Sequence, residues 1–118
     1  MLRALLRAKL HRLTVTDRKI EYEGSLTIGA DLLKEADILP GERVQVVNVN
    51  NGARFETYIL EGESGSGVVC LNGAAARLAE IGDVVIVIAY GYIEEGKISS
   101  FKPKIVLVDS KNKIKKIS

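Results

Sequence analysis

Apolar and polar residues alternate along most of the chain, and this period of two is the feature that most constrains its fold. Leu6, Ala8 and Leu10 share one face of a first predicted strand, because successive side chains of a strand point to opposite faces. The apolar positions then change phase at Leu13, which predicts a bulge or twist near Arg12. The chain is therefore expected to be mainly β.

The remaining elements are predicted to be short strands, tight turns and two short helices. The expected strands cover Val44–Val49, Arg54–Leu60, Val68–Leu71, Val84–Tyr90 and Lys104–Val108, and the expected helices cover Asp31–Leu39 and Ala74–Glu80. The expected turns and loops are Asp17–Lys19, Asn50–Gly52, Gly62–Gly67 and Asn72-Gly73. The continuous apolar run Val84–Tyr90 predicts a strand buried on both faces. No strand–helix–strand rhythm is present, so a compact barrel is favoured over an open α/β sheet.

The composition fits a single domain spanning residues 1–118. Of these residues 47% are hydrophobic but only 5% are aromatic, so the core is expected to be aliphatic. No apolar run approaches the roughly 18 residues of a membrane helix, and charges in Met1–Lys9 interrupt any signal-peptide core. The single cysteine, Cys70, excludes an intrachain disulfide and suits a reducing compartment. We therefore expect a cytoplasmic protein with no membrane partner.

The charge distribution gives little support for a nucleic-acid partner. The net charge is only +2, although basic residues gather in Met1–Lys19 and in Lys111–Ser118. The terminal lysines are interpreted as a frayed, solvated tail. No metal-ligand cluster is present, so no bound metal is expected. The glycine-rich segment Gly62–Gly67 lacks the Gly-Lys-Ser/Thr ending of a phosphate-binding loop and is interpreted as a flexible connection.

Three clusters could carry chemistry, and each has an ordinary structural explanation. Lys9 and His11 place an ammonium group and an imidazole on one strand face. Arg54 and Tyr58 share one face of another predicted strand. The small residues of Asn72–Ala76 leave backbone N–H groups open at a predicted helix start. From spacing alone, a structural histidine, an outer strand and a tight turn are the preferred explanations.

Six short blocks, however, follow one another in a distinctive order. They are Lys9–Thr16, Tyr22–Ser25, Asn51–Arg54 with Thr57-Tyr58, Gly65–Gly67, Asn72–Arg77 and Gly82-Asp83. In this order and spacing they resemble the pyruvoyl-dependent aspartate 1-decarboxylases. No single block is diagnostic, and a lone Gly-Ser pair carries no weight. The resemblance covers residues 1 to about 90. It fades after Ile93, and Arg18-Lys19 is more basic than the family pattern.

The resemblance implies an architecture and a maturation step. The implied fold is a six-stranded double-psi β-barrel with short flanking helices, assembled as a homotetramer whose active sites lie between subunits. The chain would cleave itself between Gly24 and Ser25 into residues 1–24 (the β chain) and 25–118 (the α chain). Ser25 would become a covalent pyruvoyl cofactor at the new N-terminus, either alone or with a maturation factor.

The resemblance also implies a reaction and residue roles. The pyruvoyl group would form a Schiff base with L-aspartate, which loses CO2 to give β-alanine for pantothenate and coenzyme A synthesis. Tyr58 would return the proton, Arg54 and Lys9 would bind the substrate carboxylates, and Thr57 would polarise the Gly24 carbonyl. The other site residues implied are His11, Tyr22, Asn72, Gly73, Ala74 and Ala75.

Two alternatives remain open at this point. A non-catalytic β-barrel that binds nucleic acid or a protein partner would explain the basic N-terminal segment. It would leave the joint presence of Gly24-Ser25, Thr57-Tyr58 and Asn72-Gly73 as a coincidence. A decarboxylase acting on glutamate differs by one methylene, a small difference in binding free energy.

Overall fold

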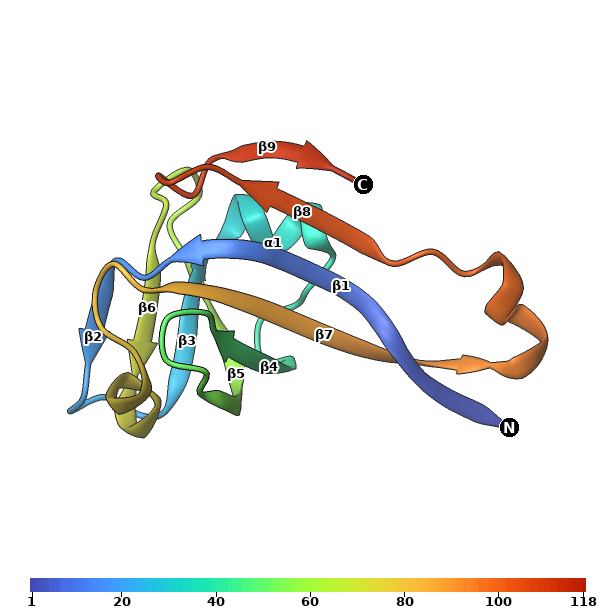
Figure 1. Ribbon diagram of the computed structural model, residues 1–118, viewed down its shortest axis with the longest axis horizontal. Coiled ribbons are helices and arrows are strands. Elements are labelled where there is room, and N and C mark those ends of the chain that lie inside the picture. Colours follow the sequence, from blue (N-terminus) through green and yellow to red (C-terminus); the bar gives the residue numbers. More distant parts are fainter.

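The computed structural model describes all 118 residues, and these form a mainly β structure (Figure 1). Nine strands pair in the order β2-β6-β3-β5-β4-β7-β1-β8-β9. The strands are β1 Leu2–Thr14, β2 Asp17–Lys19, β3 Ser25–Gly29, β4 Arg43–Asn48, β5 Arg54–Gly62, β6 Val69–Asn72, β7 Val84–Glu94, β8 Lys104–Val108 and β9 Ile114–Ile117. The helices are α1 Ala30–Ala36 and the 3-10 segments η1 Gly73–Leu78 and η2 Glu95–Ser100. The predicted mainly β class with short helices is confirmed, while closure into a six-stranded double-psi barrel stays a prediction.

A long antiparallel ribbon of β1 and β7 gives the molecule its elongated shape. The pairing runs from Leu2↔Glu94 to Thr14↔Val84, and its outer end projects to the right in Figure 1, away from the other strands. The predicted bulge is confirmed, because the register shifts between Leu10 and Leu13 and Arg12 has a positive φ of 66°. The molecule measures 44 × 27 × 24 Å along its principal axes.

The core is aliphatic, as the composition predicts, and it lies on one side of the central strands. A single cluster of 22 buried residues fills it. In β7 the buried positions are Val85, Val87 and Ala89, whereas Ile86 and Ile88 between them are only half-buried. The prediction that Val84–Tyr90 is buried on both faces is therefore wrong for the single chain, because only one face of this strand packs on the core.

Three of the local predictions need correction. Asp17–Lys19 forms β2 rather than a turn, because it pairs in parallel with β6, with Asp17 opposite Cys70. Helix α1 ends at Ala36, earlier than predicted, because Asp37 adopts the left-handed conformation with φ 56°. The small-residue segment predicted as a helix over Ala74–Glu80 is the 3-10 segment η1, which starts one residue earlier and ends at Leu78.

The lysine-rich tail is not frayed, so that prediction is also wrong. Its residues form β9, which pairs antiparallel with β8 across a turn that contains Asn112. The Asn112 side chain is 1% exposed. Its Oδ1 accepts from Thr14 N at 2.8 Å, and its Nδ2 donates to Thr14 O at 2.9 Å and to Gly67 O at 2.8 Å. The C-terminal hairpin is thereby fastened to the end of β1 and to the glycine-rich loop.

Replacing Asn112 with alanine is expected to lower the free energy of unfolding by about 2–4 kcal/mol, because it leaves buried backbone groups without partners. Alanine also tolerates the positive φ of 60° at this position poorly. Urea unfolding of the purified chain measures the effect. Lys111→Ala is the matched control, since its side chain is exposed and makes no hydrogen bond. Equal stability of the two variants would contradict the fastening role.

No helix of the structure is long and apolar enough to span a membrane.

Candidate active site

Ser25 is the first residue of β3 and is fully buried. It lies opposite Asn72, the last residue of β6, in the antiparallel pairing of these strands. Asn72 Nδ2 donates to Ser25 Oγ at 2.9 Å and to Thr27 Oγ1 at 3.0 Å. The Ser25 hydroxyl donates in turn to Glu23 O at 3.2 Å. The Ser25 oxygen is thus held between one donor and one acceptor, inside the protein.

Gly73 brings its backbone directly against the segment that precedes Ser25. It has a positive φ of 67°, and a Cβ atom there would lie 2.6 Å from Gly24 N, 2.7 Å from Gly24 Cα and 2.7 Å from Tyr22 O. A Cβ atom at Gly24 would meet only Asn72 O, at 4.0 Å, and Gly24 is not in the left-handed region. In the uncleaved chain it is therefore Gly73, rather than Gly24, whose position requires glycine.

Tyr58 lies beside Ser25 on the neighbouring strand. Strands β3 and β5 are parallel, with Leu26 opposite Ile59, and both of these side chains are buried in the core. Ser25 and Tyr58 each precede this pair by one residue, so both point to the opposite face. Tyr58 is 39% exposed. It borders a pocket of about 350 Å³ whose other lining residues are Glu21, Tyr22, Glu23 and Leu60.

Thr57 does not make the contact that the resemblance implies. Counting back from the Leu26↔Ile59 pair brings Gly24 level with Thr57, but Thr57 Oγ1 forms no hydrogen bond in this chain. Its side chain points to the face of β5 opposite Tyr58, because neighbouring residues of a strand alternate. The donor at Ser25 Oγ is Asn72, and the role of Thr57 at the Gly24 carbonyl stays a prediction.

The cationic residues form a separate group on the outer face of the sheet. Lys9 lies opposite Ile88, which lies opposite Gln45 in β4. Arg54 Nη1 donates to Gln45 Oε1 at 2.8 Å. Strand β1 is four strand spacings from β3, roughly 19 Å along the sheet, and Arg54 is four residues, roughly 13 Å, from Tyr58 along β5. One chain therefore does not bring Lys9, His11 and Arg54 to Ser25.

His11 adds no positive charge to this group at neutral pH. Burial, followed by the charges of Lys9 and Arg12, holds the pKa of the imidazole below its ordinary value of 6.5. Its Nδ1 atom is buried without a hydrogen-bond partner. The cationic residues of this face are therefore Lys9, Arg54 and Arg43, the last of which is paired with Glu56 at 3.4 Å.

Cys70 and Thr27 are the site residues that sequence reasoning missed. Cys70 Sγ lies 3.3 Å from Asn72 Oδ1, and Thr27 accepts from the same amide. Each stands two residues from a predicted site residue along its own strand. The period of two predicts that Cys70 shares a face with Asn72 and that Thr27 shares a face with Ser25. It does not predict that β3 and β6 pair, and this pairing brings the residues together.

The chain is similar to known proteins over nearly its whole length. Residues 1–115 match the sequence model of the family described as aspartate decarboxylase. The chain is 51% identical to the aspartate 1-decarboxylase of Thermoanaerobacter pseudethanolicus, covering 96% of this chain and 97% of that protein. It is 54% identical to the aspartate 1-decarboxylase of Pelotomaculum thermopropionicum, covering 97% and 86%. It is 52% identical to that of Listeria monocytogenes, covering 99% and 92%. The likeness thus extends beyond Ile93, where the motifs alone predicted that it would fade.

Proposed function

The chain belongs to the aspartate decarboxylase family, and we propose that it makes a pyruvoyl cofactor from its own Ser25 and uses it to decarboxylate L-aspartate. The products are CO2 and β-alanine, the latter a precursor for pantothenate and coenzyme A. The observation that carries the proposal is the buried contact in which Asn72 Nδ2 donates to Ser25 Oγ at 2.9 Å. A donor at this atom orients the serine oxygen for attack, and it stabilises the negative charge that the same oxygen takes up when the ester is eliminated and it leaves as part of the Gly24 carboxylate.

The cofactor arises by rearrangement of the chain itself. Ser25 Oγ attacks the Gly24 carbonyl carbon, the new O–C bond replaces the broken C–N bond, and the freed Ser25 nitrogen takes up a proton. Elimination from this ester leaves a carboxylate on Gly24 and a dehydroalanine at position 25. One water molecule then displaces ammonia and leaves the pyruvoyl group. The close approach of Gly73 to Gly24 supports this step, because it restricts the movement of the bond to be cleaved.

The residues around Ser25 fit such a group. The position is fully buried, the Asn72 amide offers donors to an oxygen there, and a pocket lined by Tyr58 and by the segment that precedes Ser25 lies next to it. The pyruvoyl ketone supplies an electron sink for the electrons left when the α-carboxylate departs. Tyr58 then holds the proton that is returned to the substrate carbon, since its hydroxyl lies on the same face as position 25.

Substrate binding requires positive charge that this pocket lacks. The pocket is lined by two carboxylates, Glu21 and Glu23, and by no cation, whereas aspartate carries two carboxylates of its own. Arg54 and Lys9 lie on the same outer face but too far from Ser25 within one chain. The complete site therefore forms between copies, as expected for a homotetramer, with Arg54 and Lys9 of one copy at Ser25 of another.

Intact mass spectrometry and a denaturing gel of the purified chain test the proposed maturation. We expect two fragments of about 24 and 94 residues, the larger one blocked to N-terminal sequencing and trapped by borohydride in the presence of aspartate. CO2 release is then measured with aspartate and with glutamate, and aspartate is expected to be the better substrate. A chain that stays whole after prolonged warming, with no pyruvoyl mass, would overturn autonomous maturation.

The shared site predicts complementation between two impaired variants. Arg54→Ala is expected to lower kcat/KM about 10- to 100-fold, the effect of losing one charge-assisted contact, and Ser25→Ala to be inactive. Co-expressed in equal amounts, the two chains form some sites with Ser25 from one copy and Arg54 from another. Random assembly is expected to restore about a quarter of the wild-type activity.

The control for complementation is a chain that carries both substitutions, co-expressed with the Ser25→Ala chain. This pair contributes no intact Ser25 and is expected to stay inactive. If the first pair shows no more activity than Arg54→Ala alone, each site must draw Ser25 and Arg54 from the same copy.

A further inference from the structure

The side-chain amide of Asn72 lies between groups of different hydrogen-bonding character. Its Nδ2 donates to the hydroxyls of Ser25 and Thr27, at 2.9 and 3.0 Å. Its Oδ1 lies 3.3 Å from Cys70 Sγ and accepts from no other donor. The strand pairing explains this arrangement, because Ser25 is opposite Asn72 and Thr27 is opposite Cys70. Cys70 is 4% exposed and Asn72 is 1% exposed, so water does not compete for these contacts.

An asparagine amide has a donor end and an acceptor end of nearly the same shape, and a half-turn exchanges them. The two hydroxyls do not decide between these orientations, since a hydroxyl both donates and accepts. With Oδ1 toward Ser25, the serine hydroxyl would donate to the amide and its oxygen would lose the N–H donor. Only the orientation with Nδ2 toward Ser25 leaves the serine proton on Glu23 O and keeps a donor on the oxygen that becomes part of the Gly24 carboxylate in the elimination.

The thiol of Cys70 does decide between the two orientations. Burial, followed by the charge of Asp17, raises the pKa of this thiol above its ordinary value, so it keeps its proton and acts as a donor. The nearest competing acceptor is Leu71 O, at 4.0 Å, which is farther than Asn72 Oδ1. In the reversed orientation the amide donor end would face a protonated sulfur, which is a weak acceptor.

We propose that Cys70 is a positioning residue for self-cleavage, whose S–H group holds the Asn72 amide with Nδ2 on Ser25 Oγ. This inference rests on the proposed function and adds to it a group that touches neither the reacting bond nor the substrate. The role requires a small donor at position 70, and a serine hydroxyl meets this requirement while an alanine methyl does not.

The test compares Cys70→Ala with Cys70→Ser in the full chain. Freshly purified precursor is incubated, and the uncleaved fraction is followed by denaturing gel and intact mass. Cys70→Ala is expected to cleave about tenfold more slowly than wild type, as for the loss of one orienting hydrogen bond. Cys70→Ser is expected to stay within about threefold of wild type. Thermal unfolding of both substitutions in the uncleavable Ser25→Ala background separates slow cleavage from poor folding.

Any other pairing of rates overturns the role of Cys70. Two variants that cleave at the same rate, whether fast or slow, would show that the donor is not what matters. A slow Cys70→Ala whose loss of thermal stability far exceeds that of Cys70→Ser would reduce the residue to a packing role. If wild type cleaves normally but the two variants do not show the expected rates, the proposed function stands and only the role of Cys70 is rejected. A wild-type chain that stays whole overturns the proposed autonomous self-cleavage, and with it the role of Cys70 in that step.

Discussion

Ser25→Ala is expected to leave the chain whole and without decarboxylase activity. The substitution removes the hydroxyl that we propose attacks the Gly24 carbonyl and, with it, the proposed source of the cofactor. The fold should survive, because Asn72 Nδ2 keeps Thr27 Oγ1 as an acceptor at 3.0 Å and Ala fits wherever Ser does. A denaturing gel is expected to show a single band of full length, and CO2 release from aspartate is expected to fall to background.

Ser64→Ala is the matched control for this prediction, since Ser64 is an exposed serine whose side chain makes no hydrogen bond. It is expected to cleave and to turn over aspartate like wild type. Thermal unfolding of Ser25→Ala and of freshly purified, still uncleaved Ser64→Ala is expected to give similar midpoints. A Ser25→Ala chain that still splits after Gly24, or that still releases CO2, would refute the origin of the cofactor.

Elements fixed by local chemistry could be predicted from the sequence. Asn50–Gly52 was predicted as a hairpin turn, and the structure joins the antiparallel strands β4 and β5 there with Gly52 at φ 76°. The predicted range Lys104–Val108 coincides with β8. In both cases the signal lies within a few neighbouring residues, where turn propensity and the period of two act directly.

Elements that depend on distant partners were missed. The polar segment Asp17–Lys19 becomes a strand only because β6, more than fifty residues later in the chain, pairs with it. The charge of Lys113–Lys116 is typical of a solvated tail. This segment nevertheless pairs with the free edge of β8, because Asn112 fixes the turn that returns the chain to that edge. Strand propensity is context-dependent in this way, since the pairing rather than the composition supplies the hydrogen bonds.

The same distinction applies to the candidate site, where residues could be predicted from the sequence but contacts between strands could not. The family resemblance identified Ser25, Asn72 and Tyr58, and the structure places all three on neighbouring strands. It could not show that Cys70 faces the Asn72 amide, because that contact follows from the register of β3 against β6. Nor could it show that Lys9 lies four strands away from Ser25, because the strand order β3-β5-β4-β7-β1 does not follow from local sequence patterns.

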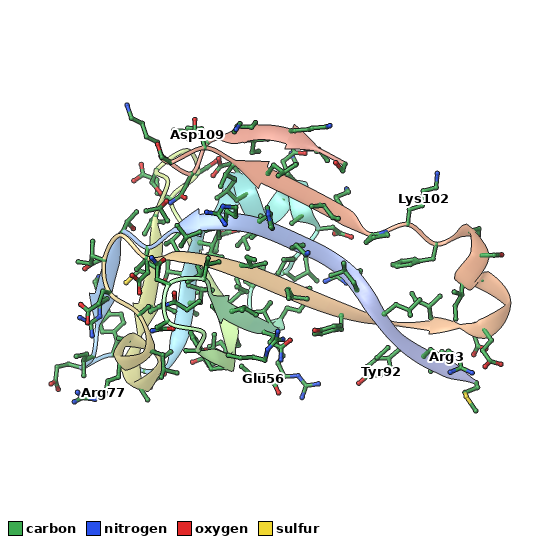
Figure 2. The ribbon with its side chains drawn as sticks, viewed as in Figure 1. Arg3, Glu56, Arg77, Tyr92, Lys102 and Asp109 are labelled. Carbon is green, nitrogen blue, oxygen red and sulfur yellow. The ribbon has the colours of Figure 1, made fainter.

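The outer face that carries the cationic group is open in the single chain. Figure 2 shows Glu56 and Tyr92 on the lower side of the sheet, with Arg3 at the free end of the β1–β7 ribbon. Tyr90 and Tyr92 are 48% and 68% exposed on it, and the Tyr90 hydroxyl donates to Gln45 Oε1, the same atom that accepts from Arg54. An assembly that covers this face would bury both tyrosines and bring Arg54 toward a second copy, in agreement with the complementation predicted above.

Tyr58→Phe is expected to spare self-cleavage and to slow turnover about a thousandfold, within the range for loss of a general acid. The Tyr58 hydroxyl makes no hydrogen bond to Ser25, Asn72 or Glu23, so the maturation step does not depend on it. The phenyl ring keeps the packing on β5. The measurements are the cleaved fraction by intact mass and kcat per cleaved chain with aspartate, with KM expected to change little because the lost contact acts on the proton rather than on the carboxylates.

Tyr22→Phe is the appropriate comparison, since Tyr22 lines the same pocket and no role in proton transfer is proposed for it. It is expected to keep kcat within a few-fold of wild type. The difference between the two tyrosines follows from their places in the fold. Tyr58 is held in a strand whose register sets it level with Ser25, whereas Tyr22 lies in the bend before β3 and is 60% exposed. If cleavage and turnover fall together in Tyr58→Phe, this residue acts in maturation, and its role as the proton donor is contradicted.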